Sequence, residues 1–151
     1  MTYQYEYPRP AVSADIVVID RRTTSSKILL IQRLKDPFAD QWALPGGFME
    51  IEETLESAAI RELREETGLI VADVQQVGAF SAVDRDPRGR VITVAFLVEL
   101  KSDQTAVAAD DARSTRWFDL HALPKLAFDH AEIIRQSLAV LSIKDRSGKY
   151  Q

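Results

Sequence analysis

Apolar positions along this chain follow two spacings, one typical of strands and one typical of helices. Runs rich in valine, isoleucine and leucine, bounded by polar or proline-containing segments, predict the main strands. These four segments are residues 11–20, 27–33, 74–83 and 90–100. Shorter strands are expected within residues 42–48, before a tight glycine loop, and over 114–118. We expect hairpins from the first pair of long strands and from the second pair, with residues 101–113 as a loop.

Two other segments are predicted to be helical. Residues 53–67 contain no glycine or proline and stop at Gly68, and Thr54 is the expected N-cap. Residues 129–142 repeat apolar side chains at helical spacing, with Asp129 as a possible cap. The order of two strands, helix, two strands and helix predicts an α/β fold, in which helices pack on a mixed sheet. A length of 151 residues favours one domain over residues 1–151.

Composition narrows the chemistry. The chain has no cysteine and only two histidines, which excludes disulfides, thiolate nucleophiles and thiolate zinc sites. A net charge of −4 offers no field that would attract nucleic acid, so we expect no nucleic-acid partner. The N-terminal residues lack the basic and apolar regions of a secretory signal, and no apolar run could span a bilayer. We therefore expect a cytoplasmic protein with no membrane contact.

The helix predicted over residues 53–67 carries a cluster of like charges. Residues three and four apart share a helix face, so Glu62, Glu65 and Glu66 should point in roughly the same direction. Like charges at this spacing destabilise a helix unless a cation neutralises them. Mg²⁺ prefers such oxygen ligands, and backbone carbonyls of the Pro45–Gly47 loop could add another. A solvated acidic face is the alternative for such a cluster taken alone.

The complete spacing from Gly47 to Leu69, GFMEIEETLESAAIRELREETGL, decides between these alternatives. It matches the Nudix box: glycine, then glutamate after five residues, then Arg-Glu after seven more, an apolar residue, any residue, Glu-Glu, any residue, glycine and an apolar residue. The chain therefore resembles the Nudix hydrolases. That resemblance implies an α/β/α layered sandwich with a mixed β-sheet, and hydrolysis of a nucleoside diphosphate joined to another group.

The resemblance also implies roles for individual residues. Divalent metal ligands are expected at Glu62, Glu65 and Glu66, with the carbonyl of Gly47 as a further ligand. The metal would be Mg²⁺, with Mn²⁺ as the alternative. Glu53 and Arg61 are expected to form a supporting ion pair that holds the loop against the helix, while a simple surface pair is the alternative.

The general base stays open at this stage. Glu62 or Glu65 could accept a proton from the attacking water. In some Nudix relatives a carboxylate in a loop late in the sheet does this work, which would here be Asp110 or Asp111. These two aspartates could equally serve only to solubilise an alanine-rich loop.

Segments outside the box resemble the ADP-ribose pyrophosphatase branch of the family. They are PRPAV at residues 8–12, residues 36–45, DRDPRGR at 84–90 and LAFDH at 126–130. Arginine binds phosphate in a bidentate manner, so the expected substrate contacts are Arg33, Arg85, Arg88 and Arg90. DRDPRGR could instead be only a hairpin turn, and LAFDH only a helix cap.

The expected reaction is hydrolysis of ADP-ribose to AMP and ribose 5-phosphate. The alternatives are another diphosphate substrate, such as a nucleoside triphosphate, a dinucleoside polyphosphate or a sugar nucleotide, and a non-catalytic ADP-ribose sensor. Tyr3, Tyr5 and Tyr7 alternate, so an extended segment would present them on one face. They could stack on adenine or seal the interface of a homodimer, which is the expected assembly; a loose edge strand is the alternative.

Overall fold

The computed structural model describes residues 2–101 and 114–149, and for residues 143–149 it describes the backbone. Its elements in chain order are β1 (Ala11–Asp20), β2 (Lys27–Gln32), β3 (Trp42–Ala43), β4 (Gly46–Phe48), α1 (Leu55–Thr67), β5 (Gln75–Phe80), β6 (Val91–Glu99), β7 (Thr115–Asp119) and α2 (His130–Lys149). In this part of the chain no helix is long and apolar enough to cross a membrane.

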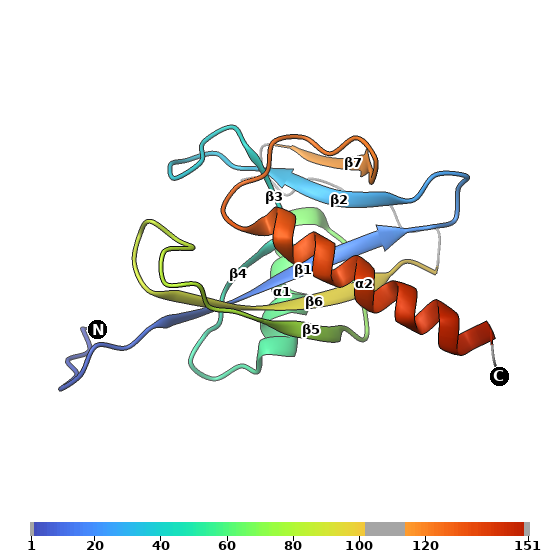
Figure 1. Cartoon of the computed structure of the whole chain (residues 1–151). Helices are drawn as coiled ribbons and strands as arrows, with labels where there is room; N and C mark the ends of the chain where they lie inside the picture. Colours follow the sequence, from blue (N-terminus) through green and yellow to red (C-terminus); the bar gives the residue numbers. More distant parts are fainter. Residues whose placement is uncertain (1, 102–113, 150–151) are drawn as a thin grey trace.

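The strands form one mixed sheet whose main path runs β3-β2-β1-β6-β5 (Figure 1). Both predicted hairpins are present, because β1 pairs antiparallel with β2 and β5 pairs antiparallel with β6. Strands β1 and β6 lie parallel at the centre, paired from Ala11 and Val91 to Ile19 and Glu99. The prediction of a mixed sheet is therefore confirmed.

Alternation along β1 places apolar side chains on both faces of the sheet. Ile16 and Val18 pack with Leu63 of α1, whereas Val17 and Ile19 pack with Ile133 of α2. Each of these side chains is fully buried, and burial of one such side chain stabilises the fold by about 1.5–3 kcal/mol. The sheet thus lies between the two helices, which confirms the α/β/α sandwich (Figure 1).

Two boundaries differ from the sequence-based predictions. The strand expected within residues 42–48 is split at Leu44 and Pro45, so that β3 pairs with β2 while β4 crosses over to pair with β1. Proline cannot donate a hydrogen bond to the sheet, which favours a break there. Helix α2 continues to Lys149, seven residues beyond the predicted end at Ser142, because no glycine or proline interrupts it before Gly148.

Asp129, offered as a possible cap, stands directly before α2, but its side chain is used elsewhere. Its carboxylate receives two hydrogen bonds from the guanidinium of Arg85, at 2.6 and 2.9 Å, and so is engaged across the molecule. The backbone carbonyl of Asp129 accepts instead from the N–H groups of Glu132 and Ile133. This contact joins the start of α2 to the β5–β6 hairpin, a link that pattern analysis of either segment cannot supply.

Candidate active site

Helix α1 presents the acidic residues because its ends and its buried face are well defined. The hydroxyl of Thr54 accepts a hydrogen bond from the N–H of Ser57 at 3.1 Å, which confirms the predicted N-cap. Gly68 ends the helix with φ of 78°, a left-handed conformation that glycine adopts at little cost. Burial of Ala59 and Leu63 against the sheet leaves Glu62, one residue before Leu63, free to reach the loop in front of the helix.

Arg61 links the acidic helix to that loop. Its guanidinium donates to both carboxylate oxygens of Glu53, to Glu62 at 2.8 Å and to the carbonyl of Phe48 at 3.2 Å. The hydrogen bonds from Arg61, aided by the N–H of Glu50, lower the pKa of Glu53 to about 2. The expected contact between Glu53 and Arg61 is therefore present, and it ties residues 48–53 to α1.

Glu66 lies at the bottom of a cleft and carries an unsatisfied polar atom. Its Oε2 is buried and makes no hydrogen bond within the protein. Burial, then the negative charge of Glu62, and to a lesser degree that of Asp15, raise the pKa of Glu66 to about 9. A cation close to these three carboxyl groups would favour the ionised form, since the like charges would then be neutralised.

The glycine pair beside Glu66 is required by close contacts. A Cβ atom on Gly47 would lie 2.5 Å from Oε1 of Glu62, and a Cβ on Gly46 would clash with Asp15. The backbone of β4 therefore lies directly against the carboxylates. This is the close approach that the sequence predicted for the glycine loop.

The three predicted metal ligands do not all converge. Glu62 and Glu66 interact, whereas the side chain of Glu65 is 52% exposed and bonds to Arg61 at 3.2 Å. Within residues 2–101 and 114–142, no group of three or more His, Asp or Glu side chains has the geometry of a metal site. Arg61 pairs with carboxylate oxygens of Glu53, Glu62 and Glu65, so one guanidinium neutralises these three groups.

His130 and Asp15 line the same cleft but were missed by sequence analysis. The N–H of Leu44 donates to Nδ1 of His130 at 3.0 Å, so the proton of the neutral ring is on Nε2. Burial lowers the pKa of His130, which keeps the ring uncharged, and Nε2 lies 3.8 Å from Asp15. The hydroxyl of Thr93 donates to Asp15 at 2.6 Å. The sequence did contain one indication of this site, because Asp15 is a charged residue inside the apolar run 11–20.

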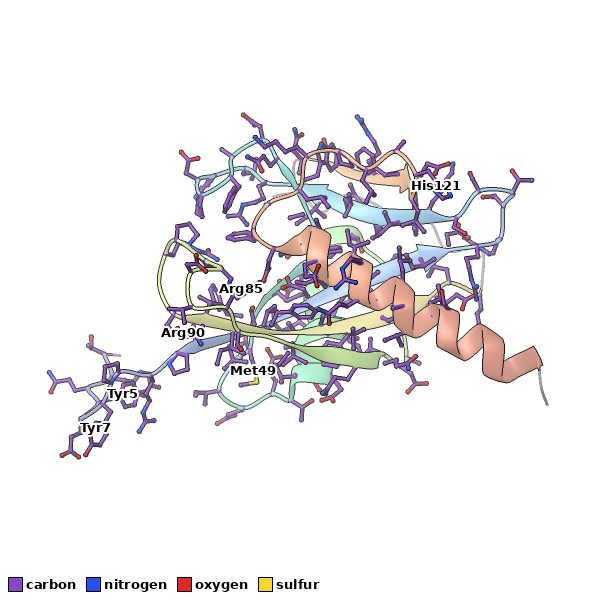
Figure 2. All side chains as sticks on the ribbon, viewed as in Figure 1. Tyr5, Tyr7, Met49, Arg85, Arg90 and His121 are labelled. Carbon is purple, nitrogen blue, oxygen red and sulfur yellow. The ribbon has the colours of Figure 1, made fainter. Side chains whose placement is uncertain are left out.

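The four predicted substrate arginines have different surroundings. Arg33, Arg85 and Arg88 line the cleft, whereas Arg90 is not among its lining residues and donates to the carbonyl of Ala82. Figure 2 shows Arg85 pointing toward the start of α2 and Arg90 where the loop between β5 and β6 meets β6. The side chain of Arg85 is 3% exposed and its donors are directed at Asp129.

The remaining pair, Arg33 and Arg88, gives the cleft a cationic wall. Burial and the nearby positive charge of Arg88 lower the pKa of Arg33, and the negative charges of Asp86 and Glu66 partly offset that effect. The two guanidiniums therefore lie near each other and face the same cleft as the carboxylates. Asp110 and Asp111, the alternative general bases, lie outside the described residues.

The cleft has a volume of about 370 Å³, within the range of about 300–1,000 Å³ that small-molecule sites occupy. Both carboxylates and arginines line it, which suits a polyanion bound by a cation and by guanidinium groups. Such a site can bind a diphosphate in which both phosphates are neutralised at once.

Comparison with known proteins agrees with this arrangement. The sequence model of the NUDIX domain matches residues 9–137, which is most of the chain. The chain belongs to the Nudix family. The resemblance stated from the box is thus confirmed, and this Nudix chain is a hydrolase of the family, whose members generally use divalent metal ions.

Two curated relatives of this Nudix chain carry names related to ADP-ribose. It is 46% identical to an "ADP-ribose pyrophosphatase" of Methanocaldococcus jannaschii over 129 residues, which cover 85% of this chain and 73% of that protein. It is 35% identical to the "ADPR responsive transcriptional repressor NtrR" of Acinetobacter baylyi over 147 residues, which cover 93% of this chain but only 58% of the repressor.

A solved structure shares the fold. The NUDIX domain of Shewanella oneidensis NrtR, crystallised with ADP ribose, superposes with a TM-score of 0.82 at 28% identity, covering 89% of this chain and 90% of that one. The predicted fold class is confirmed by this similarity. The likeness to ADP-ribose proteins agrees with the branch expected from the segments outside the box.

Proposed function

We propose that this Nudix chain hydrolyses ADP-ribose to AMP and ribose 5-phosphate with Mg²⁺ bound at the carboxylate end of its cleft. The observation that carries the proposal is the buried, unbonded Oε2 of Glu66, which lies in a cleft that also contains Arg33 and Arg88. Similarity to a named ADP-ribose pyrophosphatase and to a domain crystallised with ADP ribose supports the choice of substrate.

The residues at the carboxylate end fit a divalent cation. Glu62 and Glu66 supply carboxylate oxygens, and the backbone of Gly47 lies against Glu62, where its carbonyl is a further candidate ligand. We propose Glu65 as an outer ligand, reached when its bond to Arg61 is released. Hard oxygen donors of this kind suit Mg²⁺, and Mn²⁺ accepts the same donors.

The bound cation would neutralise diphosphate oxygens and lower the pKa of water. Water attacks one phosphorus atom, the bond from that phosphorus to the bridging oxygen breaks, and the second phosphate leaves with its sugar. Arg33 stabilises the negative charge that moves to the leaving phosphate. The water gives its proton to a general base, for which the candidates are Glu62, Glu65, Asp110 and Asp111. Among them, Glu62 lies against Gly47, a residue that lines the cleft.

Arg61 and Glu53 would act by positioning. Their ion pair holds the Phe48 carbonyl and Glu62 in a fixed relation, so we propose that they determine where the carboxylate of Glu62 lies. Arg85 would hold the wall of the cleft in place through its bond to Asp129. Arg90 would not contact the substrate, because Arg90 does not line the cleft.

Glu66→Gln tests the proposal, with Glu56→Gln as the control on an exposed site of the same helix. The amide keeps the shape of Glu66 but cannot carry its charge. We expect Glu66→Gln to reduce the release of ribose 5-phosphate from ADP-ribose by at least about 100-fold while Glu56→Gln stays near wild type. Equal activity of Glu66→Gln and wild type in Mg²⁺ would refute the assignment of the metal site.

Substrate and metal are tested by a panel. ADP-ribose, a nucleoside triphosphate, a dinucleoside tetraphosphate and a sugar nucleotide are compared at equal concentration, with Mg²⁺ or Mn²⁺. We expect the highest kcat/KM with ADP-ribose, and higher activity in Mg²⁺. If another compound is cut faster, the substrate assignment fails while the hydrolase assignment stands.

A second candidate function is ADP-ribose sensing, favoured by the similarity to the repressor of Acinetobacter baylyi. The same variants separate the two functions. An enzyme loses turnover in Glu66→Gln and still binds ADP-ribose, whereas a sensor binds ADP-ribose without turnover even in the wild type. Calorimetry beside the activity assay gives both quantities.

We further propose that residues 1–151 act as a single domain, that the chain forms a homodimer, and that it works in the cytoplasm. Tyr3, Tyr5 and Tyr7 are exposed on the N-terminal segment, which extends away from the sheet (Figure 2). Exposed aromatic rings of this kind are common at subunit interfaces. Light scattering after size exclusion tests the dimer, and a mass of about 17.0 kDa in solution would contradict it.

A further inference from the structure

Phe128 holds a backbone conformation that is costly for its side chain. Its φ is 51°, in the left-handed region that bulky residues rarely adopt, and its ring lines the cleft instead of the hydrophobic core. Phe38, with φ of 62°, packs edge-on against Phe128 with ring centres 4.7 Å apart. Strained residues persist where the surroundings hold them, and they cluster at ligand sites. The strain at Phe128 is therefore consistent with a ligand-binding role for its ring.

Phe128 faces guanidinium groups at the cleft. The Cζ atom of Arg88 lies 5.5 Å from the ring centre of Phe128 and 5.4 Å from that of Phe48. Arg33 lies 4.8 Å from the Phe128 ring. A guanidinium is planar and delocalised and stacks on aromatic faces, as a nucleobase does. Arg88 thus bridges two rings that come from β4 and from the start of α2.

The two loops that carry Arg88 and Phe128 are joined by buried charges. Arg85 bonds to Asp129 with both ends of its guanidinium, and Asp86, with a side chain only 2% exposed, pairs with Arg88 at 2.7 Å. That pair lowers the pKa of Asp86, which keeps it charged. Both sides of the aromatic site are therefore held in place before a ligand arrives, and such preorganisation favours binding.

We propose that Phe128, Phe48 and Arg88 form the site that binds the nucleobase of the substrate. The base stacks on the ring of Phe128, and Arg88 and Phe48 close the opposite side. This inference rests on the proposed function for the diphosphate, which would lie between the base and Glu66 in the same cleft. It assigns a specificity role to DRDPRGR and LAFDH, because these segments supply Arg88 and Phe128.

The test uses two ligands that share a phosphate and differ in the base. AMP carries adenine, whereas ribose 5-phosphate has none, and calorimetry measures the binding of each to the full chain. Phe128→Leu removes the aromatic face while keeping an apolar side chain at the same strained position. We expect it to weaken AMP binding about tenfold or more and to change ribose 5-phosphate binding less than about twofold.

Two further variants keep the test decisive. Phe48 is 45% exposed, so Phe48→Leu should fold normally and weaken AMP binding selectively in the same way. Phe128→Trp should retain AMP binding, because a larger aromatic face remains. Ile70→Ala is the control, since Ile70 is an exposed apolar side chain that does not line the cleft.

Several outcomes would overturn the inference. They are unchanged AMP affinity in Phe128→Leu, an equal loss for both ligands, an equal loss in Ile70→Ala, or no AMP binding by the wild type. In the hydrolysis of ADP-ribose we expect Phe128→Leu to raise KM more than it lowers kcat. A wild type that binds AMP through Phe128 but does not cut ADP-ribose would support the nucleobase site and refute the proposed reaction.

Discussion

Glu66→Gln should make the metal-free protein more stable while it removes activity. Glu66 is held among Glu62 and Asp15 in a buried position, and its pKa is raised from an ordinary 4.5 to about 9. The carboxyl group therefore has to stay protonated in the folded protein over a pH range in which it ionises readily in the unfolded chain. An amide carries no charge in either state, so the variant escapes this cost.

The size of the effect follows from the two pKa values. Below pH 4.5 the group is protonated in both states and costs nothing. Between pH 4.5 and about 9 the unfolded chain has lost the proton and the folded protein has not, so the free energy of unfolding falls by about 1.4 kcal/mol per pH unit. At about pH 7 the loss amounts to about 3 kcal/mol, or about 6–12 °C in Tm for a chain of this size.

Urea unfolding of the wild type and Glu66→Gln in EDTA, from about pH 5 to about pH 9, measures this difference directly. We expect the variant's advantage to be small at about pH 5 and to grow with pH, and Glu56→Gln to show no such trend. Saturating Mg²⁺ should shrink the advantage, since a cation stabilises the ionised wild-type site. A difference in unfolding free energy that is independent of pH would refute the reasoning.

Three more predictions concern packing and metal. Arg85→Ala should lower the free energy of unfolding by about 2–4 kcal/mol because it leaves the partly buried Asp129 without its partner. A double-mutant cycle with Asp129→Ala should show coupling of at least about 1 kcal/mol, and additive losses would contradict a direct pair. Gly47→Ala should reduce kcat about 10–100-fold because the added Cβ would displace Glu62. Gly78→Ala is the control and should keep wild-type activity, because the space around Gly78 is open. Equal rates in both variants would show that the contact between Gly47 and Glu62 does not affect catalysis. Removal of metal with EDTA should abolish ADP-ribose hydrolysis, and Mg²⁺ should restore it; activity that persists in EDTA would exclude the metal-dependent reaction.

Local features of this chain were predictable because they depend on neighbouring residues. The N-cap at Thr54, the left-handed end at Gly68 and the contact between Glu53 and Arg61 involve groups within about two helical turns of one another. Their spacing along the chain is nearly their spacing in space. The Nudix box is such a local motif, which is why the family and the candidate carboxylates could be recognised from residues 47–69.

Contacts between distant segments depended on the packing of the sheet. Asp15 is a polar position in an apolar strand, yet in the folded protein it lies 3.8 Å from His130 and accepts a hydrogen bond from Thr93. Arg85 was expected to bind substrate, but its guanidinium is engaged by Asp129, 44 residues away. Neither pairing has a local signal, since any carboxylate on the surface could have served as the partner.

The sequence by itself determined the helix that carries the glutamates, the two hairpins and the family, because hydrophobic period, capping and motif spacing act over short distances. Only the tertiary structure decided that Glu66 is buried without a partner, that Glu65 faces solvent, and that Phe48, Arg88 and Phe128 meet. The physical reason is that burial and charge depend on which elements the sheet brings together, and strands 80 residues apart in sequence, such as those of Ser13 and Thr93, are adjacent in it.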